Sequence, residues 1–278
     1  RVLFRSFHIA TTGRPGTVVI DMPKDISSSP CNVAFEDAEM DLPGYDPTPD
    51  YDFSELPKMA NFLKASSKPL LLVGHGAIIA KAHKEVLAFA EKLQAPVVTT
   101  KLGKGIIPEN HELSLGMLGM HGTAYANRAV QHCDLIFSIG SRWDDRITPA
   151  DISRFCPDAI KLHIDIDPAE INKIVMPDCS IVADAKMALE KLLPKIKPLK
   201  TKEWLSYLNK ERKKHPLSYK IHGGLKAQHV IDEFCIQTKG NALVTTDVGQ
   251  HQMWAAQFYR NNKPNGWISS GGAEIGRA

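Results

Sequence analysis

The feature that most constrains the fold is a regular alternation between residues 51 and 200. Short runs rich in Val, Ile and Leu alternate there with stretches of helical periodicity. Uniformly apolar strands are typical of a parallel sheet that helices cover on both faces. The sequence therefore predicts an α/β fold with a doubly wound parallel sheet. The predicted strands are 69–73, 96–100, 134–140, 160–165 and 180–182, and the predicted helices are 53–65, 78–93, 125–132, 169–174 and 186–195.

The residues before this alternation predict a separate unit. The end of a helix is followed by Gly13-Arg14-Pro15-Gly16, a turn that stops the helix and places a cation beside the next segment. That segment, 17–22, predicts a buried strand stopped by Pro23. Residues 27–49 are rich in Ser, Pro, Asp and Gly without periodicity, so we expect an exposed connector and a domain boundary.

Beyond residue 200 the sequence predicts a charged helix, 201–215, which we expect to bridge two domains. A third unit follows, and its predicted elements are helix 227–237, strand 242–247, helix 250–258 and strand 267–269. Roughly fifty residues are too few to close a three-layer sheet alone. We therefore expect this part to open a larger domain.

Composition argues against several classes of protein. The formal net charge of +3 is dispersed along the chain, so no nucleic-acid partner is expected. No apolar run approaches the ~20 residues of a membrane span. Five cysteines without a C-x-x-C pair predict neither a disulfide framework nor a zinc knuckle, and they favour a reducing compartment. The chain starts at Arg1 without an initiator Met or a signal peptide, so it reads as an internal piece.

A glycine-punctuated turn follows the first strand of the alternation. Gly74 and Gly76 open the next predicted helix, where backbone N–H groups can meet a phosphate. The third glycine of a full dinucleotide fingerprint is replaced by Ile79, so an ordinary strand-to-helix turn is the alternative.

A second glycine-rich run, 116–124, precedes the helix at 125–132, with Thr123 as its predicted N-cap. Three glycines in seven residues let the backbone approach a flat ligand, and Met117 and Met120 supply adaptable apolar contact. These methionines fit the hydrophobic core equally well. His121 could likewise serve only as a satisfied hydrogen-bonding group.

Charged residues follow two of the predicted strands. Arg142 and Arg146 come just after 134–140, and ligands of open α/β sheets bind outside the carboxyl ends of the strands. Two arginines there suit a diphosphate or another anion, with Asp144 and Asp145 orienting them. A local network of salt bridges is the alternative. After the next strand, the run 163–168 places an acid where it could accept hydrogen bonds from ribose hydroxyls.

Two further sites are weaker when the residues are taken alone. Lys24, just past the first predicted strand, is either a cation at the mouth of a channel or a solvated charge. The run 247–251 again leads from a strand end into a helix, a geometry that receives a diphosphate.

These motifs, together with Asp247-Val248-Gly249-Gln250-His251-Gln252-Met253-Trp254, resemble the catalytic large subunits of acetolactate synthases, also called acetohydroxyacid synthases. These are thiamine-diphosphate enzymes, and the resemblance runs nearly end to end. It implies a doubly wound, Rossmann-like FAD-binding central domain, flanked by the end of one thiamine-diphosphate-type α/β domain and the start of another. The implied divisions are 1–33 for the pyrimidine-binding domain, 34–50 for a linker, 51–200 for the FAD-binding domain, 201–222 for a connecting helix and linker, and 223–278 for the diphosphate-binding domain.

The resemblance also implies roles for individual residues. The implied FAD contacts are Arg14, Gly74, Gly76, Thr100, Leu102, Met120, His121, Gly122, Thr123, Gly140, Arg142, Asp144, Arg146, His163, Asp165, Ile166, Asp167, Val182 and Asp184. Lys24, Asp145 and Arg146 would line a substrate channel, and Gly249, Gln250 and His251 would contact thiamine diphosphate. Two positions, His75 and Lys101, depart from the glycine and the apolar residue that the family usually has.

The implied activity is the condensation of two pyruvates to 2-acetolactate and CO₂, or of pyruvate with 2-oxobutyrate, in valine, leucine and isoleucine biosynthesis. FAD would act structurally, beside thiamine diphosphate and Mg²⁺. The family's catalytic glutamate lies upstream of this sequence and its metal motif downstream, so no catalytic or metal-binding residue is assigned. We expect no turnover from the chain alone. The parent is expected to be a homodimer or larger, with a possible regulatory small subunit, in a bacterial cytoplasm or a plastid.

Two other functions stay open. A flavin-dependent 2-oxo-acid oxidase of the same superfamily would share the layout, and a non-catalytic nucleotide-binding module would need only the central sheet. The run 247–254 speaks against both. After Ser270-Gly271-Gly272 the sequence departs from the family's glycine- and methionine-rich helix start, which indicates a truncation, a frameshift or a damaged gene copy.

Overall fold

The computed structural model describes residues 2–32, 42–47 and 50–271. The chain divides into two compact units, Arg1–Tyr51 and Asp52–Ala278. Much of the predicted connector at 27–49, and all of the divergent segment 272–278, lie outside the described residues.

The described residues of the first unit form two helices, α1 (Val2–Thr11) and α2 (Lys24–Ser27). The Thr12 hydroxyl, just after α1, lies 2.8 Å from the hydroxyl of Tyr45. The prediction of a buried strand at 17–22 is wrong, because this segment joins no sheet and Val19 is 88% exposed. A strand needs a neighbour for its N–H and C=O groups. The described residues of this unit offer none.

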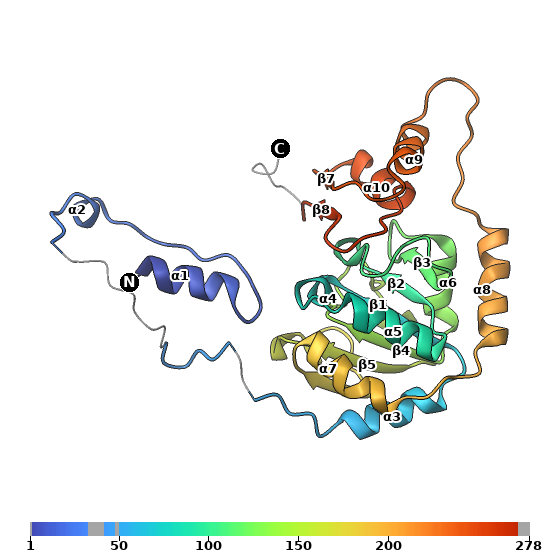
Figure 1. The fold of residues 1–278 in the computed structure, drawn as a ribbon, viewed down its shortest axis with the longest axis horizontal. Coiled ribbons are helices and arrows are strands. Elements are labelled where there is room, and N and C mark those ends of the chain that lie inside the picture. Colours follow the sequence, from blue (N-terminus) through green and yellow to red (C-terminus); the bar gives the residue numbers. More distant parts are fainter. Residues whose placement is uncertain (1, 33–41, 48–49, 272–278) are drawn as a thin grey trace. The chain divides into compact units, whose positions relative to one another are not determined.

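The second unit is built on a six-stranded sheet in the order β3-β2-β1-β4-β5-β6 (Figure 1). All of its neighbouring strands are parallel. The predicted α/β fold with a parallel sheet is therefore confirmed. This order, with a crossover between β1 and β4, is that of the doubly wound dinucleotide-binding folds. The strands are β1 (Pro69–Val73), β2 (Val97–Thr99), β3 (Ser114–Met117), β4 (Leu135–Ile139), β5 (Ile160–Asp165) and β6 (Cys179–Val182).

Helices cover both faces of this sheet. Phe137 of β4 packs on Phe89 of α5, with ring centroids 5.5 Å apart, and α5 in turn contacts α7. Its neighbour Ile136 points to the opposite face and joins a buried cluster with residues of α6 and α8. The helices between residues 52 and 222 are α3 (Leu56–Ala65), α4 (His75–Ile79), α5 (His83–Leu93), α6 (Ala124–His132), α7 (Ala185–Leu192) and α8 (Lys202–Lys214), with 3₁₀ turns η1 (Lys101–Gly103), η2 (Ile152–Arg154), η3 (Pro168–Glu170) and η4 (Leu193–Lys195).

Two local predictions are wrong in this unit, and one strand was not predicted. The single helix predicted at 78–93 is two helices, because Lys81 adopts a left-handed conformation (φ 56°) between them. The helix predicted at 169–174 is only the turn η3, and Asn172 (φ 63°) is also left-handed. Strand β3 was not predicted, since it is a four-residue edge strand that contains a glycine.

The predicted charged helix forms as α8 and packs against α6. The Trp204 indole donates to the Pro69 carbonyl at 3.0 Å, and both Trp204 and Leu208 are buried. Its apolar stripe thus belongs to the core of the central sheet.

The last part of the second unit holds α9 (Ala227–Thr238), β7 (Val244–Thr246), α10 (Gln250–Phe258) and β8 (Trp267–Ser269), close to their predicted bounds. β7 and β8 form a two-stranded parallel sheet. Phe234 and Ile236 of α9 remain about half exposed. All five cysteines are free. Within the described residues, no helix combines the length and apolarity needed to cross a membrane.

Two turns meet where the chain crosses from β1 to β4. A Cβ at Gly74 would lie 2.2 Å from the Gly140 carbonyl oxygen, and one at Gly76 would lie 2.8 Å from the Gly140 Cα. Gly140 itself has φ +59°, and a Cβ there would lie 2.6 Å from the Ala77 nitrogen. Only glycine combines this conformation with this backbone contact. The three glycines therefore hold the two strand ends together.

We predict that Gly140→Ala lowers the free energy of unfolding by about 3 kcal/mol or more, since it adds a backbone clash to a left-handed strain. Gly116→Ala is the matched control. Its φ is also positive (+75°), but the nearest atom to its Cβ is 3.9 Å away. Its cost should be only ~1 kcal/mol. Urea unfolding of both variants measures the difference, and equal costs would contradict the packing role of Gly140.

A buried aromatic stack lies below these turns. The rings of Trp143 and His163 are nearly parallel with centroids 4.8 Å apart, and the tilted ring of Phe155 lies 6.1 Å from that of Trp143. His163 Nε2 lies 2.9 Å from the Ser141 carbonyl oxygen. Burial lowers the pKa of His163 to about 4, outweighing the opposing effects of this carbonyl and of Glu170. At neutral pH the imidazole is thus uncharged.

This burial predicts a pH dependence of stability. Between about pH 6.5 and pH 4 the unfolded chain binds a proton at this histidine that the folded chain does not. Stability is therefore complete above pH 6.5 and falls with decreasing pH, by about 3 kcal/mol in all. His163→Phe keeps a ring beside Trp143 and should flatten this dependence in denaturant titrations at several pH values. The exposed His222→Gln is the control, and equal slopes for wild type and His163→Phe would disprove the assignment.

Candidate functional site

The candidate site lies at the carboxyl edge of the central sheet, defined here as the residues directly after β1, β2, β4 and β5. β1 and β4 are neighbours, yet their connections leave in opposite directions along the sheet. Such a crossover point opens a crevice in which doubly wound proteins bind ligands. The sequence-predicted residues from four strand ends therefore meet at one edge.

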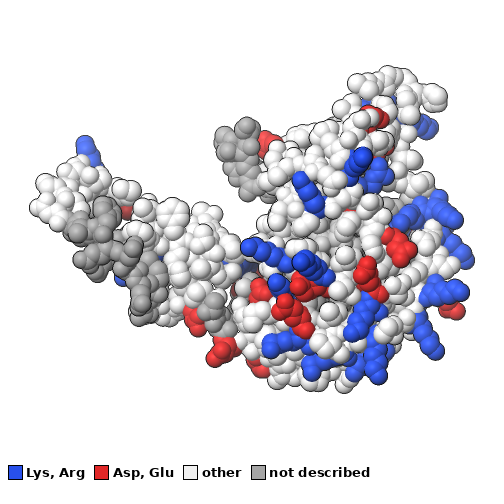
Figure 2. All heavy atoms as spheres, viewed as in Figure 1, with Lys and Arg blue, Asp and Glu red and all other residues white. Residues whose placement is uncertain are grey.

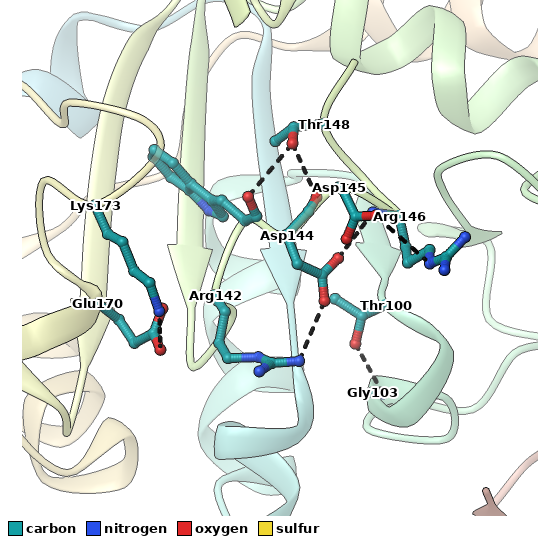
Figure 3. A network of polar contacts seen from close by, with 10 residues as sticks. Thr100, Gly103, Arg142, Asp144, Asp145, Arg146, Thr148, Glu170 and Lys173 are labelled. Carbon is teal, nitrogen blue, oxygen red and sulfur yellow. Dashed lines mark hydrogen bonds and ion pairs between the residues drawn. The ribbon is translucent and has the colours of Figure 1, made fainter. Parts of the chain in front are cut away.

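The residues after β4 form a tight, self-bonded loop (Figure 3). The Asp144 carboxylate accepts hydrogen bonds from the Arg146 backbone N–H at 3.1 Å and from Arg142 Nη2 at 3.4 Å. Its carbonyl oxygen accepts from the backbone N–H and the hydroxyl of Thr148, both at 2.9 Å. Asp144 thus fixes the path of the loop, and Arg142 is oriented by it as predicted.

The arginines of this loop remain accessible to an anion. The Arg142–Asp144 pair is 3.4 Å long with side chains 57% and 36% exposed, and the 3.8 Å Arg146–Asp145 pair is more exposed still. Exposed, long ion pairs stabilise a fold little. The local salt bridges therefore exist, but they leave both guanidinium groups facing solvent. Figure 2 shows the blue and red side chains interspersed over one face of the molecule.

Lys101 also belongs to this edge, as the first residue of η1 after β2. Its Nζ donates to the Ser270 carbonyl oxygen at 2.9 Å. Burial and the charge of Arg146 lower the pKa of Lys101, while Asp144 acts in the opposite direction. Lys101 is therefore a cation within electrostatic reach of the loop after β4. Thr100 before it caps η1, its hydroxyl accepting from the Gly103 N–H at 3.2 Å, and Leu102 is the central residue of that turn.

The glycines after β1 act differently from their predicted role. The N–H groups of Gly74 and Gly76 donate to the carbonyls of Ile139 and Gly140, both at 3.0 Å. These groups are thus engaged within the chain, and the glycines instead permit the close backbone approach described above. Two hydroxyls beside them, Thr99 Oγ1 and Ser141 Oγ, are buried without a hydrogen-bond partner among the described residues. Orphaned buried hydroxyls mark polar capacity that the folded chain leaves unused.

The loop between β3 and α6 resolves the alternatives for its residues. Met117 is buried in the core, whereas Met120 is 67% exposed. Thr123 is the N-cap of α6, as predicted, accepting from the Ala126 N–H at 3.2 Å, and Gly122 precedes it. The side chain of His121 is exposed, and its carbonyl oxygen accepts from Gln257 of α10. In this loop the side chains of Met120 and His121 are therefore exposed, and that of Thr123 is buried.

A groove of about 940 Å³ opens beside this loop, between α6 and residues 145–152. Met120, Asp145 and Arg146 line it together with Asn127, Thr148 and Phe155. Its size is that of a small-molecule site, and it combines apolar walls with a cation.

The residues after β5 and β6 mostly serve the fold. His163, an implied FAD contact, is buried in the stack with Trp143. The carboxylate of Asp165 accepts from the Asp167 N–H, and that of Asp167 from Ala169, at about 3.0 Å. Ile166 lies between them, Val182 ends β6, and Asp184 caps α7 through the Met187 N–H at 3.0 Å.

The predicted thiamine-diphosphate residues follow β7. Gly249 has φ 152°, and a Cβ there would lie 2.9 Å from the ring of His251. Gln250 and His251 are exposed at the start of α10. Exposed residues at a helix start beside a parallel strand end can receive a diphosphate. The described residues contain no group of three His, Cys, Asp or Glu side chains that could hold a metal.

Arg14 and Lys24 belong to the first unit, where Arg14 follows α1 and the exposed Lys24 begins α2.

Three residues that shape this edge were not assigned a role from the sequence. Asn127 of α6 holds the loop through two 2.9 Å hydrogen bonds, one to each backbone polar group of Gly119. Thr148 fixes the loop after β4, and Lys101 adds a cation. Lys101 could have been found from the sequence, because a charged residue stands there where the family usually has an apolar one. Asn127 and Thr148 could not, since their partners are backbone groups that only the folded loops bring near.

Two parts of the chain match known protein families. Residues 56–192 match the family described as "Thiamine pyrophosphate enzyme, central domain", and residues 247–276 match "Thiamine pyrophosphate enzyme, C-terminal TPP binding domain". The first match spans the whole parallel sheet. The second starts at the end of β7, where the predicted thiamine-diphosphate residues lie.

Three similar proteins carry related names. The chain is 43% identical to the acetolactate synthase large subunit of Corynebacterium glutamicum, 41% to that of acetolactate synthase isozyme 3 of Escherichia coli, and 42% to a probable acetolactate synthase large subunit of Methanocaldococcus jannaschii. The alignments cover 98%, 98% and 96% of this chain, but 44%, 49% and 47% of those proteins. The chain thus spans about half the length of these relatives, and it belongs to the thiamine pyrophosphate enzyme family.

Proposed function

We propose that this chain forms the middle of an acetolactate synthase large subunit. The whole enzyme would condense two pyruvates to 2-acetolactate and CO₂, or pyruvate with 2-oxobutyrate to 2-aceto-2-hydroxybutyrate, in branched-chain amino-acid biosynthesis. The observation that carries this proposal is an identity near 40% over nearly all of the chain, with relatives from bacteria and an archaeon that share the name.

Within this enzyme the carboxyl edge of the central sheet would hold FAD. Arg142 and Arg146 supply exposed guanidinium groups for its diphosphate, and the groove beside Met120 offers room for a flat ring. The buried, unpartnered hydroxyls of Thr99 and Ser141 fit a polar ligand at the same edge. FAD would serve as a structural cofactor there.

The residues after β7 would bind the diphosphate of thiamine diphosphate, with Gly249 forming the turn and Gln250 and His251 contacting the ligand. When bound, that cofactor supplies the carbanion chemistry that joins two 2-oxo acids. Asp145 and Arg146 would line a substrate channel, where the arginine attracts the carboxylates of the 2-oxo acids. Mg²⁺ would be held by residues outside this sequence.

The remaining assignments follow from the same proposal. We assign 1–33 to the pyrimidine-binding domain, 51–200 to the FAD-binding domain and 223–278 to the diphosphate-binding domain, with 34–50 and 201–222 as connections. The relatives are named large subunits, which favours a regulatory small-subunit partner. The parent would be at least a homodimer.

The flavin site can be tested by titration. The chain should bind FAD with a shift of the flavin absorbance, and Arg142→Ala should weaken binding about tenfold or more because a charge-assisted phosphate contact is lost. Arg154→Ala removes another exposed arginine, outside the groove, and should bind FAD as the wild type does. Folded chain that binds no FAD would refute the flavin assignment.

The activity can be tested in a chimaera. This chain would replace the matching segment of the E. coli isozyme 3 large subunit, whose other half supplies the rest of the enzyme. We expect the chimaera to form 2-acetolactate from pyruvate, detected colorimetrically. The reason is that this chain would supply the contacts to FAD, substrate and thiamine diphosphate that we propose for its segment. A chimaera that folds and binds both cofactors without forming acetolactate would contradict the proposal. Anaerobic reduction of its flavin by pyruvate would instead indicate an oxidase.

A further inference from the structure

Lys101 lies where the carboxyl ends of two parallel sheets meet. It follows β2 of the central sheet, and its ammonium donates at 2.9 Å to the carbonyl oxygen of Ser270, which follows β8 of the small sheet. The same carbonyl accepts from Gln252 Nε2 of α10 at 3.0 Å. Ser270 is fully buried, and its N–H donates to Thr246 at the end of β7. The ammonium is thereby held at one place.

The charge of Lys101 lacks a close partner of opposite sign. Among the described residues it makes no ion pair within 4 Å, and its hydrogen-bond partner is a neutral carbonyl. Asp144, the carboxylate whose charge reaches it, is bonded to Arg142. Arg146 repels it. A half-buried cation within electrostatic reach of another cation is costly unless an anion compensates the charge.

The hydrogen-bonding capacity of Lys101 is also unfilled. An ammonium has three N–H donors, and Ser270 takes one of them. The donors that remain belong to a charged group, and charge-assisted hydrogen bonds to oxyanions are the strong ones. The remaining N–H donors of Lys101 and the guanidinium group of Arg146 are suited to binding a small oxyanion.

We infer that Lys101 is an anion-binding residue of this edge, which with Arg146 receives an oxyanion, either a phosphate or a carboxylate, at the junction of the two sheets. The inference rests on the proposed function only for the source of the anion, which would be the diphosphate of FAD or the carboxylate of a 2-oxo acid. Removing the charge of Lys101 should weaken the binding of oxyanions and leave the binding of the flavin ring unchanged.

The experiment measures binding of inorganic phosphate, pyruvate, FAD and riboflavin to the full chain by calorimetry and flavin absorbance. Lys101→Met should weaken the binding of at least one oxyanion about tenfold, which is the effect expected from the loss of one charge-assisted hydrogen bond. Lys101→Arg should restore this binding. Lys92→Met is the matched control. Lys92 is also half-buried and donates to a backbone carbonyl at 2.9 Å, that of Leu193, but away from the edge.

The ligands separate the two sources. Weaker binding of FAD with unchanged binding of riboflavin assigns Lys101 to the diphosphate. Weaker binding of pyruvate assigns it to the carboxylate. If wild type binds phosphate through Lys101 but no FAD, the flavin proposal fails and the anion site stands. If circular dichroism shows that the Lys101→Met variant is unfolded, the Lys101→Gln variant is used in its place. Unchanged binding of phosphate, pyruvate and FAD in folded, uncharged variants overturns the inference, as does wild type that binds none of them.

Discussion

The structure depends on the contact between two backbone turns, those that follow β1 and β4. Gly74 and Gly76 press on Gly140 so closely that a Cβ at any of the three would lie within 2.8 Å of the opposing backbone. This contact fixes where α4 begins and where the loop of Arg142 to Arg146 leaves the sheet. Because glycine alone tolerates both the conformation and the distance, the position of the charged residues depends on residues that carry no charge.

The polar and apolar parts of this edge have separate tasks. Trp143, His163 and Phe155 form a buried stack in which the histidine is neutral at neutral pH. Arg142 and Arg146 of the same region remain exposed, and their carboxylate neighbours pair with them and with the loop backbone. A rigid support beside accessible cations is the arrangement that a preorganised anion site requires. The inferred role of Lys101 extends this site toward the small β7–β8 sheet.

Much of the fold and part of the site followed from local patterns. β1, β5, α10 and β8 form at their predicted bounds because continuous apolar runs and punctuating turns specify them without reference to the rest of the chain. Thr123 is the predicted N-cap for the same reason. The predicted strand 17–22 failed, because a strand is defined by its neighbour. The burial of His163 was not predicted, because a motif near a strand end does not tell which of its side chains the folded chain covers.

The sequence by itself determined the fold class, the family and the residues that gather at the strand ends, since these depend on periodicity, punctuation and residue type. Tertiary structure alone decided which of those residues face a ligand. It buried His163, engaged the amides of Gly74 and Gly76 in the chain, and brought Lys101 to Ser270 across 169 positions. The physical reason is that accessibility and charge compensation arise from neighbours distant in sequence, which no local pattern encodes.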